Sequence, residues 1–188
     1  MSKDLLNVKV QGHLRITEKE TGNVLFDMHN DINAENFSLA IANALTANSA
    51  GFIRYMKFGN GGARATSSNK YIYSVPQTVG RAATLYNEIS EATKDLNITD
   101  EDNYMTVTHA TGNTYTDILV RATLKKQDLN GVLGSDGDNN SIISEQSFSE
   151  IGLFSGDKSL LTHLCFSPVQ KSQQSSLIFD YLIRIAVV

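Results

Sequence analysis

Apolar residues recur at every second position in several segments of this chain, and this period constrains the fold more than any other feature. The clearest case runs from Leu177 to Val188, and the same alternation appears over 6–17 and 115–124. Successive side chains of a β-strand point to opposite faces of its sheet, so a two-residue period indicates strands with one buried face. The expected buried faces are Leu6, Val8, Val10, Leu14 and Ile16; Ile118, Val120, Ala122 and Leu124; and Leu177, Phe179, Tyr181, Ile183, Ile185 and Val187.

Turn residues join these strands into hairpins. Gly22-Asn23 separates the first strand from the next β-like run, and Gly112-Asn113 does the same later in the chain. The length of 188 residues suits a single domain, residues 1–188. About eight strands at this spacing predict a mainly β fold, an antiparallel β-sandwich. We expect the strands at 6–17, 24–28, 53–58, 104–109, 115–124, 148–154, 160–166 and 177–188.

One short α-helix, roughly residues 34–48, is expected to flank the sandwich. Asn33 or Asn36 can cap its start, because an Asn side chain accepts a hydrogen bond from a free N–H of the first turn. Apolar residues at every fourth position then form a single stripe along the helix. The stripe consists of Phe37, Ile41 and Leu45, with Ala40 and Ala44 between them.

Long polar segments predict surface loops. Residues 63–70 are small and polar, and residues 130–141 are almost wholly Gly, Asp, Asn and Ser. The acidic segment 88–102 is expected to be an exposed connector. Residues 81–87 are ambiguous between a strand and a short helix.

Composition argues against several classes of partner. The formal net charge of −4 gives no general electrostatic reason to bind nucleic acid as the main partner. No window approaches the roughly 18 apolar residues that a membrane-spanning helix needs, and the polar first residues do not resemble a signal peptide. Cys165 is the single cysteine, so no intrachain disulfide can form. We expect it to be a small buried hydrophobe.

The loop Gly59-Asn60-Gly61-Gly62 invites a phosphate-binding interpretation, because glycines let backbone N–H groups approach an anion. However, no Lys-Ser or Lys-Thr pair follows, and the next residues do not begin a helix. A tight turn, or a backbone presented to a neighbouring subunit, is favoured.

Metal sites are not expected. Asp136, Asp138 and Asn140 have the spacing that begins a calcium loop, but Ser141 and Ser147 stand where that loop needs Gly and Glu. The four histidines lie far apart in sequence and form no metal-ligand pair with a nearby residue. His13 and His109 are expected on solvated strand faces and His163 in a half-buried position; the fourth is His29.

Catalytic motifs are likewise missing from the sequence. It contains no Gly-x-Ser-x-Gly, Cys-x-x-Cys or His-Glu-x-x-His. The paired carboxylates of 88–102 lack the apolar surroundings that acid/base chemistry needs. We therefore expect no enzyme, no catalytic residues and no cofactor.

Short segments of the chain follow one another in a characteristic order: the hairpin Leu14-Arg15-Ile16-Thr17 to Val24-Leu25-Phe26-Asp27, then Asn30-Asp31-Ile32 and the helix, Tyr55-Met56-Lys57-Phe58-Gly59-Asn60-Gly61-Gly62, Leu85-Tyr86-Asn87-Glu88, Phe148-Ser149-Glu150-Ile151-Gly152-Leu153-Phe154, Phe166-Ser167-Pro168-Val169-Gln170-Lys171-Ser172 and Asp180-Tyr181-Leu182-Ile183-Arg184-Ile185. In this order they resemble small structural proteins of tailed bacteriophage virions. The resemblance implies a β-sandwich that assembles through subunit contacts. The expected assembly is a ring in the neck or collar, at the head-to-tail junction. Since the chain lacks the repetitive shaft of a fibre, a stand-alone neck, collar or baseplate component is favoured. A baseplate or tail-fibre attachment protein is the alternative to the neck or collar ring.

The same resemblance implies that the partners are further copies of this chain and other virion proteins of the neck or tail. The expected location is the virion, after synthesis in the host cytoplasm. Ring subunits need strand edges or loops that neighbours complete, and the candidates for this role are the polar loops 63–70 and 130–141 and the C-terminal strand. The candidate interface residues are Phe52, Gly59, Asn60, Gly61, Gly62, Tyr71 and Tyr73.

A second hypothesis is a β-sandwich module that binds a carbohydrate or a host receptor through its loop tips. Sugar sites commonly place an aromatic ring against the sugar face. The chain contains no Trp, so only tyrosines could serve. The candidates are Tyr71, Tyr73, Tyr104 and Tyr115.

Overall fold

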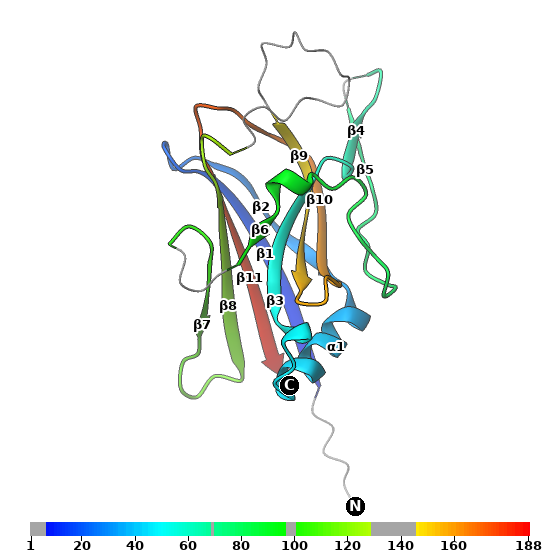
Figure 1. Cartoon of the computed structure of the whole chain (residues 1–188), viewed down its shortest axis with the longest axis vertical. Helices are drawn as coiled ribbons and strands as arrows, with labels where there is room; N and C mark the ends of the chain where they lie inside the picture. The colour runs from blue at the N-terminus through cyan, green and yellow to red at the C-terminus, as the bar shows by residue number, and fades with distance from the viewer. Residues whose placement is uncertain (1–6, 69, 97–100, 129–145) are drawn as a thin grey trace, which may run out of the picture.

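In the computed structural model, the chain folds into one large, curled antiparallel sheet with a helix packed at one end (Figure 1). It describes residues 7–68, 70–96, 101–128 and 146–188. The strands are β1 (Val8–Glu18), β2 (Val24–Ile32), β3 (Ile53–Gly59), β4 (Ala63–Ala65), β5 (Tyr71–Tyr73), β6 (Lys94–Asp95), β7 (Tyr104–Thr108), β8 (Tyr115–Leu124), β9 (Gln146–Ser155), β10 (Leu160–Lys171) and β11 (Leu177–Val187). The helices are α1 (Ala34–Leu45), and the 3-10 turns η1 (Ser49–Gly51) and η2 (Ser90–Ala92).

Nine strands pair in the order β6-β3-β9-β10-β2-β1-β11-β8-β7, and β4 pairs with β5 as a separate two-stranded arm. Strand β2 belongs to two layers, because residues 24–30 pair with β1 while residues 31–32 pair with β10. The sheet therefore bends at β2 and folds β3, β9 and β10 over β1, β11 and β8. The predicted mainly β architecture with one flanking helix is confirmed. Among the described residues, eight strands have five or more residues, and β4, β5 and β6 are short additions.

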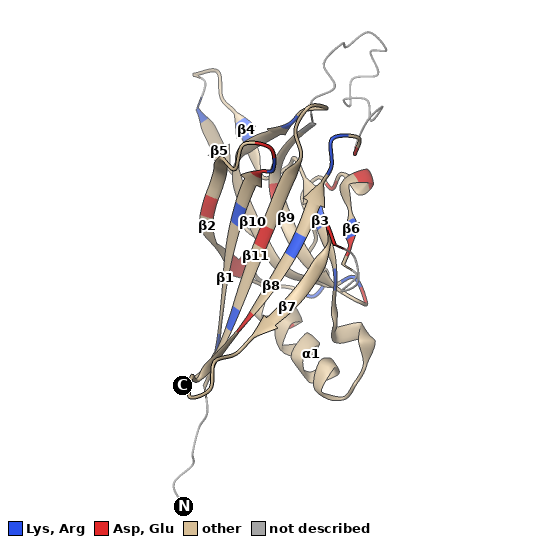
Figure 2. Cartoon of the chain, turned by 90° about the vertical axis from the view of Figure 1, so that its left-hand side faces the viewer, with Lys and Arg blue, Asp and Glu red and all other residues tan. Residues whose placement is uncertain are grey.

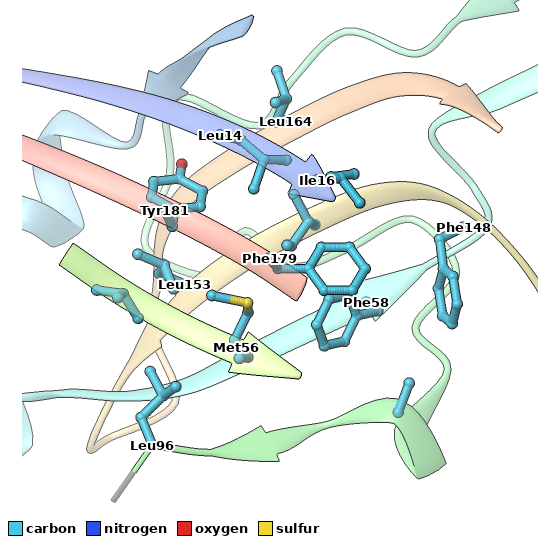
Figure 3. Packing of buried hydrophobic residues seen from close by; sticks show 14 of the residues in the cluster. Leu14, Ile16, Met56, Phe58, Leu96, Phe148, Leu153, Leu164, Phe179 and Tyr181 are labelled. Atoms are coloured by element: carbon cyan, nitrogen blue, oxygen red, sulfur yellow. The ribbon is translucent and has the colours of Figure 1, made fainter. Parts of the chain in front are cut away.

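The core lies between the two layers. The inward faces of β1, β8 and β11 are the alternating residues expected from the sequence, and their central members are fully buried. Phe58 of β3 links the layers, with ring centroids 4.6 Å from Phe179 and 5.6 Å from Phe148 (Figure 3). At the strand ends the residues of the inward faces become exposed, since Val8 is 58% and Val187 is 40% exposed.

Helix α1 is shorter than the predicted 34–48. The side chain of Asn33 accepts a hydrogen bond from the backbone N–H of Asn36 at 3.1 Å, which identifies Asn33 as the N-cap. The helix stops at Leu45 because Ala47 adopts a left-handed φ of 57°. Phe37 is buried against the core, but Leu45 is 83% exposed. The predicted apolar stripe is therefore wrong at its last residue.

Charged residues lie on the neighbouring strands β1, β11 and β8 (Figure 2). Several of them form cross-strand ion pairs on the face away from the core. Arg121 makes a bidentate contact with Asp180 at 2.6 and 2.7 Å, and Arg184 contacts Asp117 at 2.7 Å through both pairs of atoms. The hydrogen bond from Arg184 is the main reason that the pKa of Asp117 is lowered. Opposite charges therefore lie beside one another on neighbouring strands, as expected for the solvent-exposed face of strands that have one buried face.

Three predictions for the segments between the long strands need correction. Segment 88–102 is not simply an exposed connector, because Ile89, Ala92 and Leu96 are buried in the main core. The loop predicted at 63–70 begins with β4 and turns into β5. The segment 81–87 is neither strand nor helix. The predicted loop at 130–141 lies outside the described residues.

We expect Phe179→Ala to lower the free energy of unfolding by about 3–5 kcal/mol, because it removes a fully buried ring that contacts Phe58. Urea unfolding followed by circular dichroism measures this change. The matched control is Val187→Ala on the same strand, where 40% exposure predicts a loss within about 0.5 kcal/mol. Equal losses in the two variants would contradict the core assignment.

Candidate functional site

The most unusual side chain in the fold is a buried carboxylate. Glu150 on β9 is fully buried, yet its two oxygens receive hydrogen bonds from four N–H groups. Oε1 accepts from the backbone of Gly61 at 2.9 Å and Asn87 at 2.8 Å. Oε2 accepts from the backbone of Tyr86 at 2.9 Å and from His163 Nε2 at 3.0 Å. A carboxylate offers about four lone-pair positions, so these donors occupy its capacity.

These contacts decide the protonation state of Glu150. Burial is the largest influence and raises the pKa of its carboxyl group. The hydrogen bond from His163 and the three backbone N–H groups act against burial and outweigh it. The net result is a lowered pKa, so Glu150 is an ionised acceptor at neutral pH.

His163 on β10 is fully buried, which corrects the prediction of a half-buried residue. Its Nδ1 accepts the backbone N–H of Gln77 at 2.8 Å, so Nδ1 carries no proton. Its Nε2 therefore carries the proton that is donated to Glu150. The two neighbours together select one neutral tautomer.

Cys165 lies next to this pair but is not an activated nucleophile. Its Sγ is 3.7 Å from His163 Nε2. Burial, followed by the negative charges of Glu150 and Asp31, raises the pKa of the thiol to about 12. Because Nε2 already carries a proton, the imidazole cannot accept the thiol proton. The arrangement therefore lacks the base that a Cys–His catalytic pair requires.

Glu150, His163 and Cys165 place possible metal-ligand atoms within 4.8 Å of one another. It is the one such group of three among the residues that the structure describes. Binding a cation at Nε2 would require the proton to move to Nδ1, where it would face the N–H of Gln77. The tautomer and the occupied carboxylate thus oppose metal binding. The cluster is better explained as a structural hub, which we call the Glu150 hub.

The sequence contained a signal for this hub that our interpretation missed. His163 and Cys165 are two residues apart, so they share one face of a strand. Cys165 pairs directly with Glu150 across β9 and β10. An acidic residue inside the mostly apolar strand 148–154 indicates a buried charge that needs partners. Only the pairing of the two strands shows that the partners meet.

The Glu150 hub holds a segment that has no regular structure. Residues 74–87, which we call the strap, are all described, and none of them lies in a strand or helix. Four buried polar side chains from β9, β10 and the start of α1, which with the main sheet we call the body, bind the backbone of the strap. Besides Glu150 and His163, Asn33 Nδ2 donates to the carbonyl of Gly80 at 3.2 Å, and Asn36 Nδ2 donates to that of Arg81 at 3.4 Å. At these positions, side chains thus supply the hydrogen bonds that a neighbouring strand would otherwise provide to the backbone.

The glycine loop lies beneath the strap. A Cβ on Gly61 would approach the Cβ of Tyr86 to 2.6 Å, and one on Gly62 would meet the carbonyl oxygen of Ser149 at 2.0 Å. The N–H of Gly61 does bind an anion, but that anion is the carboxylate of Glu150. The loop is therefore a close-packed turn, as one of the two sequence interpretations had it.

The predicted interface residues fall in separate places. Tyr71 and Tyr73 are about half exposed on the β4–β5 arm, where the hydroxyl of Tyr73 contacts Ser167 Oγ at 2.7 Å. Asn60 is exposed, whereas Gly59 and Gly62 are buried and Gly61 is partly buried. Phe52 lies elsewhere, at an apolar cavity. The structure does not unite the seven residues in one patch, and their role as an interface stays a prediction. The calcium-like residues Asp136, Asp138 and Asn140 lie outside the described residues.

An open cavity of about 1200 Å³ lies between α1, η1 and β3 on one side and β7, β8 and β11 on the other. Apolar side chains dominate its walls. Its charged lining residues are Asp157 and Arg54, and Arg54 is paired with Asp95 at 2.7 Å. Among the residues that the structure describes, the cavity lining thus shows no convergent group of titrating side chains of the kind an active site uses. Its apolar lining includes Phe37, Ile41, Ile53, Met105, Val107 and Ile118.

Comparison with protein-family models, with curated proteins and with solved structures gives no match. Among the described residues, no helix has the length and apolar character needed to cross a membrane. Function is therefore inferred from the geometry of the chain and from its sequence resemblance.

We expect Glu150→Gln to destabilise the fold at pH 7 by about 3–5 kcal/mol, because the neutral amide presents a donor to N–H groups that need an acceptor. The contribution of Glu150 exists above its unfolded pKa, near 4.5, and is lost as the pH falls through its lower folded pKa. Denaturant unfolding at several pH values should therefore show the two proteins converge in acid. Asp27→Asn, at a side chain 46% exposed, is the control and should change stability by less than about 1 kcal/mol.

The imidazole of His163 should be neutral with its proton on Nε2 at pH 7. Long-range ¹H–¹⁵N correlation spectra distinguish the two ring nitrogens and report the tautomer directly. A proton on Nδ1, or a Zn²⁺-dependent shift of both ring nitrogens, would contradict the structural interpretation of the hub.

Proposed function

We propose that this chain is a structural subunit of a tailed-phage virion that assembles through subunit contacts into a neck or collar ring. The observation that carries the proposal is the convergence of the resembling segments on the Glu150 hub. The glycine loop, Leu85-Tyr86-Asn87-Glu88 and the strand containing Glu150 come together there through hydrogen bonds. The four N–H groups that bind Glu150 are all used in contacts within the chain. The convergence of these segments therefore supports a structural role.

Assembly requires a surface that a neighbour can complete, and β7 offers one. It ends the sheet and pairs with β8 alone among the described strands. Its sequence, Tyr104-Met105-Thr106-Val107-Thr108, contains no charge and no Pro, and its register with β8 has no bulge. Exposed strand edges normally carry such protective features because their unpaired N–H and C=O groups invite another strand. Strand β7 therefore has the character of a pairing edge.

The cavity beside β7 adds apolar contacts to this edge. Met105 and Val107 line it, and Val107 is 70% exposed although it is apolar. Phe52 is 48% exposed and also lines the cavity. We propose that a neighbouring copy adds a strand to β7 and places alternate apolar side chains in the cavity. The C-terminal strand cannot play the role considered from sequence, because β11 is paired with β1 and β8 on its two sides.

A closed ring needs two different contact surfaces on each subunit. The β4–β5 arm is the second candidate, since Tyr71, Ile72 and Tyr73 are 47%, 48% and 50% exposed. Figure 1 draws this arm and β7 on opposite sides of the molecule. Their placement suits a head-to-tail arrangement in which each subunit contacts two neighbours.

The carbohydrate-binding alternative gains no support from the tyrosines. Tyr71 and Tyr73 lie on the arm, whereas Tyr104 and Tyr115 lie on β7 and β8. Arg121 lies 5.7 Å from the ring centroid of Tyr104, and Arg184 lies 4.1 Å from that of Tyr115. The four rings do not form one sugar platform. Attachment in a baseplate or at a tail fibre remains the alternative location, with the same mechanism of assembly.

We expect Val107→Lys to weaken self-association by about 30-fold or more, the effect of losing an interface residue worth about 2 kcal/mol. The added charge would have to be desolvated between β7 and the incoming strand. Analytical ultracentrifugation measures the association, and negative-stain microscopy shows whether rings form.

Val24→Lys introduces the same charge at the 42% exposed end of β2 and serves as the control, which should associate like the wild type. A wild-type chain that stays monomeric at every concentration, alone and with neck proteins, would refute the proposed function. Assembly that Val107→Lys leaves unchanged would refute the role of β7.

A further inference from the structure

The strap is attached to the body in a way that depends on protons. Its N–H groups at Gln77, Tyr86 and Asn87 all bind the Glu150–His163 pair. The other hydrogen bonds from buried body side chains are the amide contacts of Asn33 and Asn36. One coupled pair of titratable groups therefore holds three of the strap's backbone donors.

The closed strap accommodates only one protonation state of the pair. A protonated imidazole donates from both ring nitrogens, so a proton on His163 Nδ1 would face the N–H of Gln77, 2.8 Å away. A protonated Glu150 would likewise turn an acceptor oxygen into a donor among four donors. Closure thus requires a neutral imidazole and an ionised carboxylate.

Few other titratable groups surround the imidazole. Glu150 faces it from β9 at 3.0 Å, and Cys165 lies beside it on β10 at 3.7 Å. Asp31 on β2 is paired with His163 in the sheet, and the ring centroid of Tyr86 on the strap lies 5.6 Å from that of His163. The N–H of Gln77 occupies Nδ1 and leaves no place for a proton on that nitrogen while the strap is closed.

We propose that the strap is a proton-operated latch, in which uptake of a proton at His163 Nδ1 accompanies release of residues 74–87 while the sheet stays folded. Once the strap opens, Nδ1 loses its partner and meets water, where imidazoles gain a proton between about pH 8 and 5. The open form then binds one proton more than the closed form. Linkage therefore favours opening as the pH falls, by up to about tenfold per pH unit.

Glu150 adds a second step at lower pH. Its pKa is lowered in the closed form, so its support for closure is complete above about pH 4.5 and is lost as the pH falls through the lower folded value.

Opening can be local because the strap has no strand ladder. Its clearest apolar anchor is Leu85, which packs with Phe154 and Leu160. By contrast, β9 and β10 pair over most of their length. Segments held by few contacts open at lower free energy than the core. Ser74 follows β5 directly, and its contacts with Gly61 and Gly62 would be released with the strap. The latch thus connects acidity with the position of the β4–β5 arm.

Amide hydrogen exchange on the full chain tests this latch, with rates corrected for the intrinsic pH dependence of exchange. Between about pH 7.5 and 5, the protection of the Gln77, Tyr86 and Asn87 amides should fall by up to tenfold per pH unit. The amides of Leu153 on β9 and Leu164 on β10 should keep their protection. Constant protection of the strap, or a parallel loss in the sheet, would overturn the proposal.

The variant His163→Asn keeps a side-chain acceptor near Nδ1 but cannot take up a proton, so its strap should exchange without this pH dependence. His13→Asn changes an exposed histidine of β1 and should behave like the wild type. If amide exchange in the strap of His163→Asn still depends on pH as in the wild type, the role of His163 is refuted. If that variant does not fold, ¹⁵N shifts of the wild type decide, since protonation of His163 must rise together with exchange of Gln77.

Discussion

The structure depends on the solvation of one buried anion by the chain itself. Moving a carboxylate out of water costs several kcal/mol, and the cost is offset only if nearly every lone pair finds a donor. Glu150 meets this condition with three backbone N–H groups and one imidazole. The donors come from the glycine loop, the strap and β10, so satisfying the charge brings these three parts of the chain together.

This requirement explains features that otherwise look unrelated. The glycine loop contains glycines because its backbone must approach Glu150, Tyr86 and Ser149 more closely than a Cβ allows. The strap needs no strand pairing because side chains satisfy its backbone. His163 is buried and neutral because it lies between an acceptor and a donor. The tautomer of His163 and the hydrogen bonds to Glu150 therefore oppose metal binding in a cluster that has the residue types of a metal or thiol site.

The surfaces of the molecule divide in a similar way. The outer face of β1, β11 and β8 is covered by paired charges, which suits contact with water. Strand β7 itself contains no charged residue, and apolar side chains dominate the described walls of the adjoining cavity. Burying the charged face would require desolvating its ion pairs. Covering β7 would instead pair backbone groups that no other described strand pairs, and would bury apolar side chains. This contrast favours association through the edge.

The sequence by itself determined the local elements of this protein. Period-two alternation identified the strands and their inward faces, turn residues identified the hairpins, and an Asn before a period-four stripe identified the helix. These properties depend on neighbouring residues and are therefore readable along the chain. The order of the strands, the exposure of Leu45, the burial of His163 and the convergence on Glu150 were decided by tertiary structure alone. Each depends on which distant segments pack together. The three backbone donors of Glu150 lie 63 to 89 residues away in the sequence, so no local pattern identifies them.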